Sequence, residues 1–136
     1  MPVLTRIPSA FTKSFSEGLR VATTDGAWIF ISGVVGMPMQ PSDQKPESFE
    51  AEVRVCFDRI AASLAKFGTG LGSVVNIKAY LTDLEPYAQF SRVRGEVFPQ
   101  DPPTSTAVQV AGLLLNARIE IDAVAFVPDA AAPASS

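Results

Sequence analysis

Residues 48–67 carry the pattern that most constrains the fold, because their apolar side chains recur at intervals of three and four positions. This spacing places one apolar stripe along a helix. The stripe consists of Phe49, Val53, Phe57, Ile60, Leu64 and Phe67. Ser48 is suited to the N-cap of this helix, and Gly68 to its C-terminal cap. Such a helix must bury its stripe against another element, so we expect it to cover one face of a sheet.

The remaining residues of this helix predict ordinary packing and solvation. Cys56 lies beside the apolar stripe and is expected to be a small core residue. Glu50 and Glu52 suit the positive end of the helix dipole. We expect them, with the other charged residues of the helix, to form a solvated face.

A β-hairpin is predicted before this helix. Residues 18–23 and 27–33 are rich in β-branched and aromatic side chains, and Thr24-Asp25-Gly26 separates them. Asp-Gly between two apolar runs favours a tight turn in which the glycine adopts a positive φ. Because the second run is apolar on both faces, it is expected to be a central strand, with Trp28 and Phe30 in the core.

A third strand and a second helix are predicted after the first helix. In residues 73–81 the apolar side chains alternate, so that Val75, Ile77, Ala79 and Leu81 share one face. Thr82 or Asp83 is expected to cap a helix that runs to about Phe98, with Pro86 in its first turn.

Two further strands, 104–110 and 117–127, complete the predicted domain. The order of strands, helix, strand, helix and two strands predicts an α+β fold, with one sheet covered by two helices on one face. We expect residues 1–127 to form a single domain and 128–136 to be a tail. The small and polar members of the last two strands are expected on the open face. They are Ser105, Ala107, Gln109, Arg118, Glu120 and Asp122.

Composition excludes several kinds of chemistry and interaction. The chain has no histidine, which removes histidine-based acid–base catalysis and most zinc sites, and we expect no metal and no cofactor. Its single cysteine excludes an internal disulfide. The net charge of −3 gives no support to nucleic-acid binding. The apolar runs are too short to cross a membrane and no signal peptide is recognisable, so a cytoplasmic protein is expected.

Four segments, spaced over about residues 15–126, resemble the RidA/YjgF/UK114 family of reactive-intermediate deaminases. They read SFSEGLRV, IFISG, LAKFGTGLGSVVNIKAYLTDLEPYAQF and PTSTAVQVAGLLLNARIEIDAVA. The resemblance implies a chorismate-mutase-like fold with a mixed six-stranded sheet. It also implies a homotrimer whose sheets pack into a barrel, with small-molecule clefts between neighbouring subunits. Many family members hydrolyse enamines or imines to a ketone and ammonia, without cofactor or metal.

The resemblance also implies roles for individual residues. Glu120 matches a glutamate that helps to hold the attacking water, and Ser32 and Gly33 match a Ser-Gly pair at the cleft. Phe15 replaces the family's usual tyrosine, and Ser91 aligns with an asparagine of the second helix. The candidate catalytic residue is therefore Glu120. The candidate substrate-binding residues are Phe15, Ser32, Gly33, Ser91, Phe98, Thr104, Ser105, Thr106 and Ala107.

The family signature Pro-Ala-Arg-Ser is altered here to Pro103-Thr104-Ser105-Thr106. In deaminating members that arginine binds the substrate carboxylate, and losing such a contact costs roughly 2–5 kcal/mol of binding. We therefore expect a substrate that is neutral or that carries its carboxylate elsewhere. Replacement of the missing group by Arg92, Arg94 or Arg118 is left open, against the alternative that these arginines are merely solvated.

Three functions are compatible with these sequence features. The first is hydrolysis of an enamine, an imine or a related small molecule, with specificity altered at Ser105. The second is a non-catalytic module that binds a small molecule or a protein through the same cleft. The third, endoribonuclease activity, is the weakest, because an acidic chain without a basic patch has little with which to bind RNA. Glu120 could equally be a solvated or ion-paired residue, and residues 104–106 could serve only as a turn after the prolines.

Overall fold

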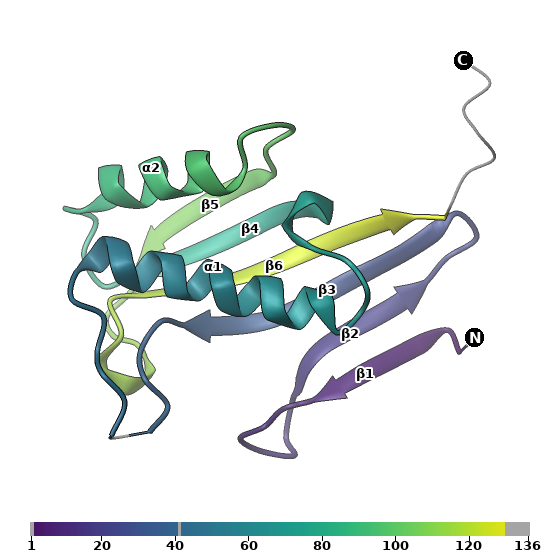
Figure 1. Cartoon of the computed structure of the whole chain (residues 1–136), viewed down its shortest axis with the longest axis horizontal. Coiled ribbons are helices and arrows are strands. Elements are labelled where there is room, and N and C mark those ends of the chain that lie inside the picture. The colour runs from purple at the N-terminus through teal and green to yellow at the C-terminus, as the bar shows by residue number, and fades with distance from the viewer. Residues whose placement is uncertain (1, 41, 130–136) are drawn as a thin grey trace.

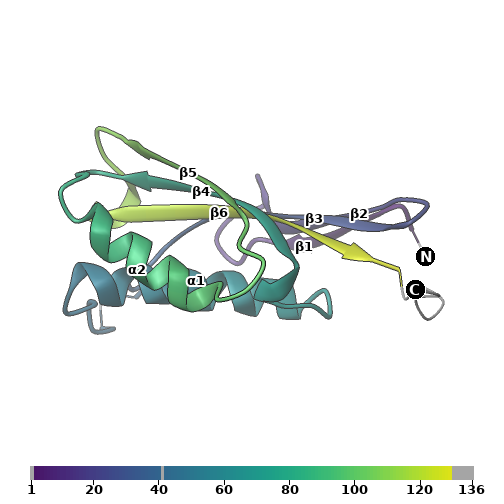
Figure 2. The same cartoon turned by 90° about the horizontal axis from the view of Figure 1, so that it is seen from above.

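The computed structural model describes residues 2–40 and 42–129, which form one six-stranded sheet with two helices on one face (Figures 1 and 2). The strand order is β1-β2-β3-β6-β4-β5. The strands are β1 (Leu4–Pro8), β2 (Ser16–Ala22), β3 (Gly26–Val35), β4 (Val74–Leu81), β5 (Thr104–Gln109) and β6 (Ile119–Pro128). The helices are α1 (Phe49–Ala65) and α2 (Tyr87–Val97), and two short 3₁₀ turns are Leu71–Ser73 and Leu114–Asn116. Among the strands of the described ranges only β4 and β5 pair in parallel, so the predicted mixed α+β sheet is confirmed.

Helix α1 forms as the periodicity predicts. The Ser48 hydroxyl accepts a hydrogen bond from the backbone N–H of Ala51 at 3.0 Å, and Gly68 adopts a φ of 80° just beyond the helix. The apolar stripe is buried against the sheet from Phe49 to Leu64. Cys56 is also completely buried and is therefore a core residue, as expected. This burial raises the pKa of its thiol to about 12.

Glu52 departs from the expected solvated face of α1, because its side chain is completely buried. Its carboxylate accepts hydrogen bonds from the backbone N–H and the Nε of Arg118, at 2.7 and 2.6 Å. The backbone at Glu52 also packs closely on the chain after β3, since a Cβ at Gly36 would lie 2.3 Å from the Glu52 carbonyl oxygen. Helix α1 is thereby joined to the end of β3 and the start of β6.

Helix α2 begins later than predicted. It starts at Tyr87, directly after Pro86, and ends at Val97. The expected cap Asp83 instead accepts a hydrogen bond from the backbone N–H of Glu85 at 2.9 Å, which closes a turn before the helix.

The hairpin between β2 and β3 is confirmed, but the role of Gly26 differs from the expected one. Among the described residues the only glycine with a positive φ is Gly68, so the hairpin does not use a left-handed glycine. A Cβ at Gly26 would lie 2.3 Å from the carbonyl oxygen of Val127 on β6. Glycine is therefore required by the close approach of two backbones.

The covered face of the sheet carries the predicted apolar residues of β6 and most of those of β4. Ile119, Ile121, Ala123 and Ala125 are all buried beneath the helices. In β4 the expected alternation fails at Val75, because an irregularity in register between Val74 and Asn76 leaves Val75 40% exposed.

Trp28 and Phe30 lie on the open face of the sheet, so their expected place in the core is wrong. They remain 40% and 45% exposed, and the Trp28 ring meets Phe126 of β6 edge-on at 4.9 Å. Strand β3 is therefore apolar on both faces for two different reasons. One face is buried under the helices, and the other belongs to an apolar surface that nothing covers in the described chain.

The face expected for β5 is also corrected. Ser105 and Ala107 pair with the buried residues Ile77 and Ala79 of β4, which places them on the helix-covered side. Thr106 pairs with Lys78 and lies on the open face. The covered side of an edge strand is only half-buried, and small polar residues are tolerated there.

The folded chain continues past the expected boundary at residue 127. Strand β6 runs to Pro128, and the backbone N–H of Asp129 donates to the carbonyl of Asp25 at 2.8 Å. Residues 130–136 of the expected tail lie outside the described residues. Within the described ranges no helix combines the length and hydropathy needed to cross a membrane.

We predict that Glu52→Ala lowers the free energy of unfolding by about 1–3 kcal/mol, because it removes a fully buried carboxylate and leaves the part-buried N–H of Arg118 without its partner. Urea denaturation at a fixed protein concentration measures this loss. The matched control is Glu50→Ala on the same helix, whose carboxylate pairs only with Arg54 and Arg92 at the surface and is expected to cost less than about 1 kcal/mol. Equal losses in the two variants would contradict a structural role for the buried carboxylate.

Candidate functional site

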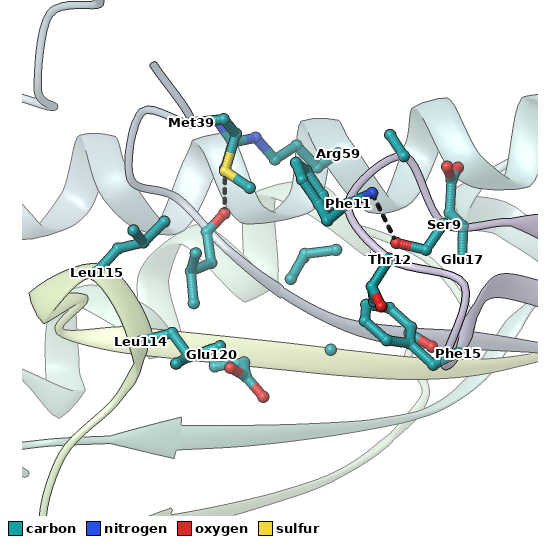
Figure 3. A pocket seen from close by; sticks show the side chains of 15 residues that line it. Ser9, Phe11, Thr12, Phe15, Glu17, Met39, Arg59, Leu114, Leu115 and Glu120 are labelled. Atoms are coloured by element: carbon teal, nitrogen blue, oxygen red, sulfur yellow. Dashed lines mark hydrogen bonds between the residues drawn. The ribbon is translucent and has the colours of Figure 1, made fainter. Parts of the chain in front are cut away.

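A cavity of about 480 Å³ opens beside β3 and β6, at the end of the sheet where the 9–15 loop and the Leu114–Asn116 turn approach each other (Figure 3). Its walls are largely apolar. Four candidate residues line it: Phe15, Ser32, Gly33 and Glu120. The structure thus brings together the predicted catalytic residue and three of the predicted substrate-binding residues.

The Glu120 carboxylate lies directly against the backbone of Gly33. A Cβ at position 33 would be 2.5 Å from Oε2 of Glu120, so any larger residue there would displace the carboxylate from its present position. This contact depends on a bulge in β3: between the paired residues Ile31 and Val34, two residues face a single residue of β6. Bulges of this kind redirect side chains at the edge of a site.

Glu120 is the least compensated acid of the cavity. Burial raises the pKa of its carboxyl, and the negative charge of Asp122 raises it further. No side chain or backbone group of the described residues forms a hydrogen bond or an ion pair with it. Asp122, in contrast, accepts a hydrogen bond from the Tyr80 hydroxyl at 3.0 Å and lies 3.6 Å from Nζ of Lys78. Glu120 is thus free to accept a proton from a ligand or a water in the cavity.

Two short segments form the apolar walls around this acid. In the 9–15 loop, the Ser9 hydroxyl accepts a hydrogen bond from the backbone N–H of Phe11 at 3.1 Å (Figure 3). Phe11 and Phe15 remain 66% and 49% exposed. On the other side are Leu114 and Leu115, and Leu115 has a φ of 60°, which is costly for a branched residue. A strained backbone that presents apolar side chains to a cavity is a feature of binding sites.

Two other polar side chains of the cavity, Ser32 and Arg59, already have backbone partners. Ser32 donates its hydroxyl proton to the carbonyl of Ser16 at 2.6 Å, which leaves only its lone pairs for a ligand. Arg59 of α1 donates to the carbonyls of Val35 and Met37 and holds the chain after β3 against the helix. Its charge has no acidic partner among the described residues, so it gives the cavity a positively charged rim.

Ser91 and Ser105 lie in a different part of the molecule from the cavity residues. They are near the β5 edge of the sheet, which Figure 1 shows at the opposite edge from β1. Both hydroxyls accept hydrogen bonds from Arg94 of α2, at 3.1 and 2.9 Å.

The remaining candidates do not line this cavity. Thr104 bonds to Asn76 Nδ2 at 2.8 Å and to the Val75 carbonyl at 3.1 Å, and so ties β5 to β4. Thr106 is exposed on the open face, and Ala107 packs against the core. Phe98 is buried, and its ring packs against that of Phe57 with ring centres 5.6 Å apart.

Several cavity residues were not predicted from the sequence: Phe11, Met39, Arg59, Leu114 and Leu115. A signal for two of them was the run Leu113-Leu114-Leu115, which interrupts polar loop composition between two strands without a strand or helix period. Within the described ranges, no group of three or more histidine, cysteine, aspartate or glutamate side chains could hold a metal ion.

Comparison with known proteins gives consistent matches. The model of the Endoribonuclease L-PSP family matches residues 8–127. A RutC family protein of Pyrococcus abyssi is 27% identical over 112 residues, 82% of this chain and 85% of that protein. Reactive Intermediate Deaminase A, chloroplastic, of Arabidopsis thaliana is 31% identical over 97 residues, 71% of this chain and 52% of that protein.

The fold is matched equally well. The crystal structure of Escherichia coli TdcF with bound serine superposes with a TM-score of 0.74 and 25% identity, covering 90% of this chain and 94% of that chain. Since the family model spans both helices and strands β2 to β6 up to residue 127, and the matched proteins carry RutC and reactive-intermediate-deaminase names, the chain belongs to the RidA/YjgF family.

Proposed function

We propose that the protein hydrolyses an enamine or imine to a carbonyl compound and ammonia, with Glu120 as the base that activates water. The observation that supports this most directly is an unpaired carboxylate with a raised pKa in an apolar cavity. Family membership adds support, because a relative from Arabidopsis thaliana is named a reactive intermediate deaminase.

The reaction needs only groups that Glu120 and water supply. Glu120 takes a proton from water while the water oxygen adds to the carbon of the C=N bond, and the protonated Glu120 passes that proton to the nitrogen, which gives a neutral tetrahedral carbinolamine. Glu120 then takes the hydroxyl proton of this adduct and returns it to the nitrogen as the C–N bond breaks. Cleavage of the C–N bond releases ammonia and leaves a carbonyl group, so the sum is imine plus water to ketone plus ammonia. A carboxyl with a pKa above its ordinary value is suited to both transfers.

Specificity differs in this proposal from that of relatives with the full signature. Ser105 stands where they carry arginine, and Phe15 offers an apolar ring in place of a tyrosine hydroxyl. The apolar walls contributed by Phe11, Leu114 and Leu115 favour a ligand with an apolar substituent next to the reacting carbon.

We further propose that the working unit is a homotrimer, with the cavity completed at a subunit boundary. The open sheet face supports this, because Trp28, Phe30 and Val108 leave 40–45% of their surfaces exposed on it. An apolar sheet face of this kind is normally covered by another layer. A ring of subunits would place the β5 edge of one chain next to a neighbour.

The non-catalytic alternative is favoured by one observation, the replacement of two polar ligand-binding positions by Phe15 and Ser105. In that case the cavity would bind a small molecule without turnover. Endoribonuclease activity, which the description of the matched family names, has no comparable support in a chain of net charge −3.

Glu120→Gln is predicted to abolish imine hydrolysis while leaving the protein at least as stable at pH 7. The raised pKa of the folded state means that ionising Glu120 costs stability, and this cost grows as the pH rises above the ordinary pKa. Ammonia release from 2-iminobutyrate and from a neutral aliphatic imine measures activity, and urea denaturation measures stability. Glu85→Gln, an exposed acid outside the cavity, is the control. Turnover that survives in Glu120→Gln would refute the catalytic role.

The pH dependence provides a second prediction. Hydrolysis should rise with pH as Glu120 ionises, through a pKa above the ordinary glutamate value. Because the charge of Asp122 contributes to that elevation, Asp122→Asn should move the acid limb of the profile to lower pH. The kcat/KM profile of both proteins, measured on one neutral imine, tests the sign. A shift to higher pH, or no shift, would contradict the assignment of the limb to Glu120.

The assembly is predicted to have three times the chain mass of 14.4 kDa in light scattering at micromolar concentration. Phe30→Lys should reduce that mass, because it places a charge on the open sheet face. Leu84→Lys changes a similarly exposed residue away from the sheet and should leave the mass unchanged. A wild-type protein with the mass of a single chain would overturn the proposed assembly.

A further inference from the structure

Two polar side chains of the sheet line the cavity of about 480 Å³, and both can act there only as hydrogen-bond acceptors. Ser32 of β3 gives its hydroxyl proton to the carbonyl of Ser16 at 2.6 Å, so its lone pairs alone are available to a ligand. Glu120 of β6, once ionised, is an acceptor with no hydrogen-bond or ion-pair partner among residues 2–40 and 42–129. Ser32 and Glu120 are called the acceptor pair below. A ligand that satisfies this pair must supply donors.

The negative charge of Glu120 is also the one that a ligand could balance. Glu17, the other acid among the described lining residues, accepts hydrogen bonds from Nζ of Lys66 at 2.9 Å and from the Ser63 hydroxyl at 2.7 Å. Its charge is therefore already paired within the fold. At Glu120 no cation takes this place in the described chain, so an added positive charge is favoured there.

Arg59 does not supply that charge, although it lines the same cavity. Its Nη1 donates to the backbone carbonyls of Val35 and Met37, which directs the guanidinium to the chain after β3. Figure 3 shows Arg59 and Glu120 on opposite sides of the cavity. The cation of the rim and the acid of the sheet thus remain apart, and the acid is left for a ligand.

Apolar side chains flank the acid on two sides. Figure 3 shows Leu114 and Leu115 on one side of the cavity and Phe11 and Phe15 on the other, with Glu120 between them in that view. From 49% to 78% of the surface of each of these four side chains is exposed, so a ligand can cover much apolar area. The cavity volume falls within the range of sites for drug-sized ligands. It is much larger than an ammonium group alone requires.

We propose that this cavity binds a primary ammonium ion that carries an apolar body, such as an alkyl or arylalkyl group. The ammonium group has three N–H donors and no acceptor, which matches the carboxylate oxygens and the serine lone pairs of the acceptor pair. The apolar body lies between the 9–15 loop and the Leu114–Asn116 turn.

A cation is favoured over a neutral ligand of the same shape for an electrostatic reason. Partial burial raises the pKa of the Glu120 carboxyl, and the negative charge of Asp122 raises it further, so the ionised form is costly in the empty cavity. An ammonium ion removes this cost. Hydrogen bonds between charged partners are also roughly twice as strong as those between neutral groups.

The site extends the proposed reaction, and this step alone rests on the proposed function. The imine would carry an apolar group on its nitrogen, R₂C=N–R′. Addition of water and cleavage of the C–N bond then give R₂C=O and H₂N–R′, so a primary amine is released in place of ammonia. The amine takes up a proton from water and is the ammonium ion that the cavity binds.

Equilibrium binding of 2-phenylethylamine to the intact protein tests the site without any turnover. We expect saturable shifts of the backbone amide resonances of Gly33, Glu120 and the two flanking segments in an NMR titration at neutral pH. The alcohol of the same shape, 2-phenylethanol, should bind at least about tenfold more weakly, because it has no charge. Methylamine, which has no apolar body, should also bind at least about tenfold more weakly. L-Phenylalanine, which adds a carboxylate to the same amine, should bind more weakly because the apolar walls do not solvate that group.

Two variants test the charge. Glu120→Gln should weaken 2-phenylethylamine binding about tenfold or more, because the amide keeps the shape and one acceptor oxygen but loses the charge. Asp122→Asn removes the same charge from the same strand, but this acid is already held by the Tyr80 hydroxyl and lies near Lys78. It should not weaken the binding. Native resonances outside the cavity in each spectrum show that the fold is retained.

A second pair of variants tests the apolar wall. Leu114→Ala should weaken 2-phenylethylamine binding about threefold or more, because the aromatic body loses covered apolar area. Leu84→Ala truncates an exposed leucine outside the cavity and should leave the affinity unchanged.

Three results would overturn the proposal: no saturable binding of 2-phenylethylamine by the wild type, equal loss in Asp122→Asn and Glu120→Gln, or equal affinity for 2-phenylethanol. Tighter binding of L-phenylalanine than of the amine would overturn the assigned ligand class. The proposed hydrolysis is judged separately. Amine binding that depends on Glu120 in a protein that hydrolyses no imine would keep this site and refute the enzyme, whereas imine hydrolysis by a protein that binds no amine would do the reverse.

Discussion

The buried carboxylate of Glu52 is the contact on which the geometry of the site depends. Burying an anion is costly unless hydrogen bonds replace its hydration, and here the backbone N–H and the guanidinium of Arg118 do so. The same turn of α1 touches Gly36, just after β3. One turn of α1 thus holds the end of β3 and the start of β6 together. Gly33 lies near that end of β3, and Glu120 near that start of β6.

Two glutamates within this small domain show how surroundings divide the roles of one side chain. Glu52 is fully buried and has strong donors, and it supports the fold. Glu120 is only partly buried, and no donor forms a hydrogen bond with it among the described residues. Its partial burial and the negative charge of Asp122 raise the pKa of its carboxyl. Glu120 thus lowers the stability of the fold whereas Glu52 supports it, as expected when a protein carries a reactive group.

The sequence predicted which residues share a face more reliably than it predicted which face is covered. Period-two alternation paired Ile119 with Ile121 and separated Ser105 from Thr106, both correctly. It could not identify the covered side of β5, because an edge strand has too few buried residues to mark it. Trp28 and Phe30 were assigned to the core because an uncovered apolar face carries the same residue types as a buried one. The hydrogen bonds of Arg94 could not be predicted, because they join α2 to β5 and no local sequence pattern encodes the relative position of these two elements.

Because Gly33 and Glu120 are in contact, a substitution at one position affects what the other position can accommodate. A side chain of any size at position 33 would occupy the space of the carboxylate, so the acid would have to move or shorten. Aspartate at position 120 would release that space but would also withdraw the acid from the cavity by one carbon. Substitutions at the two positions are therefore expected to be non-additive.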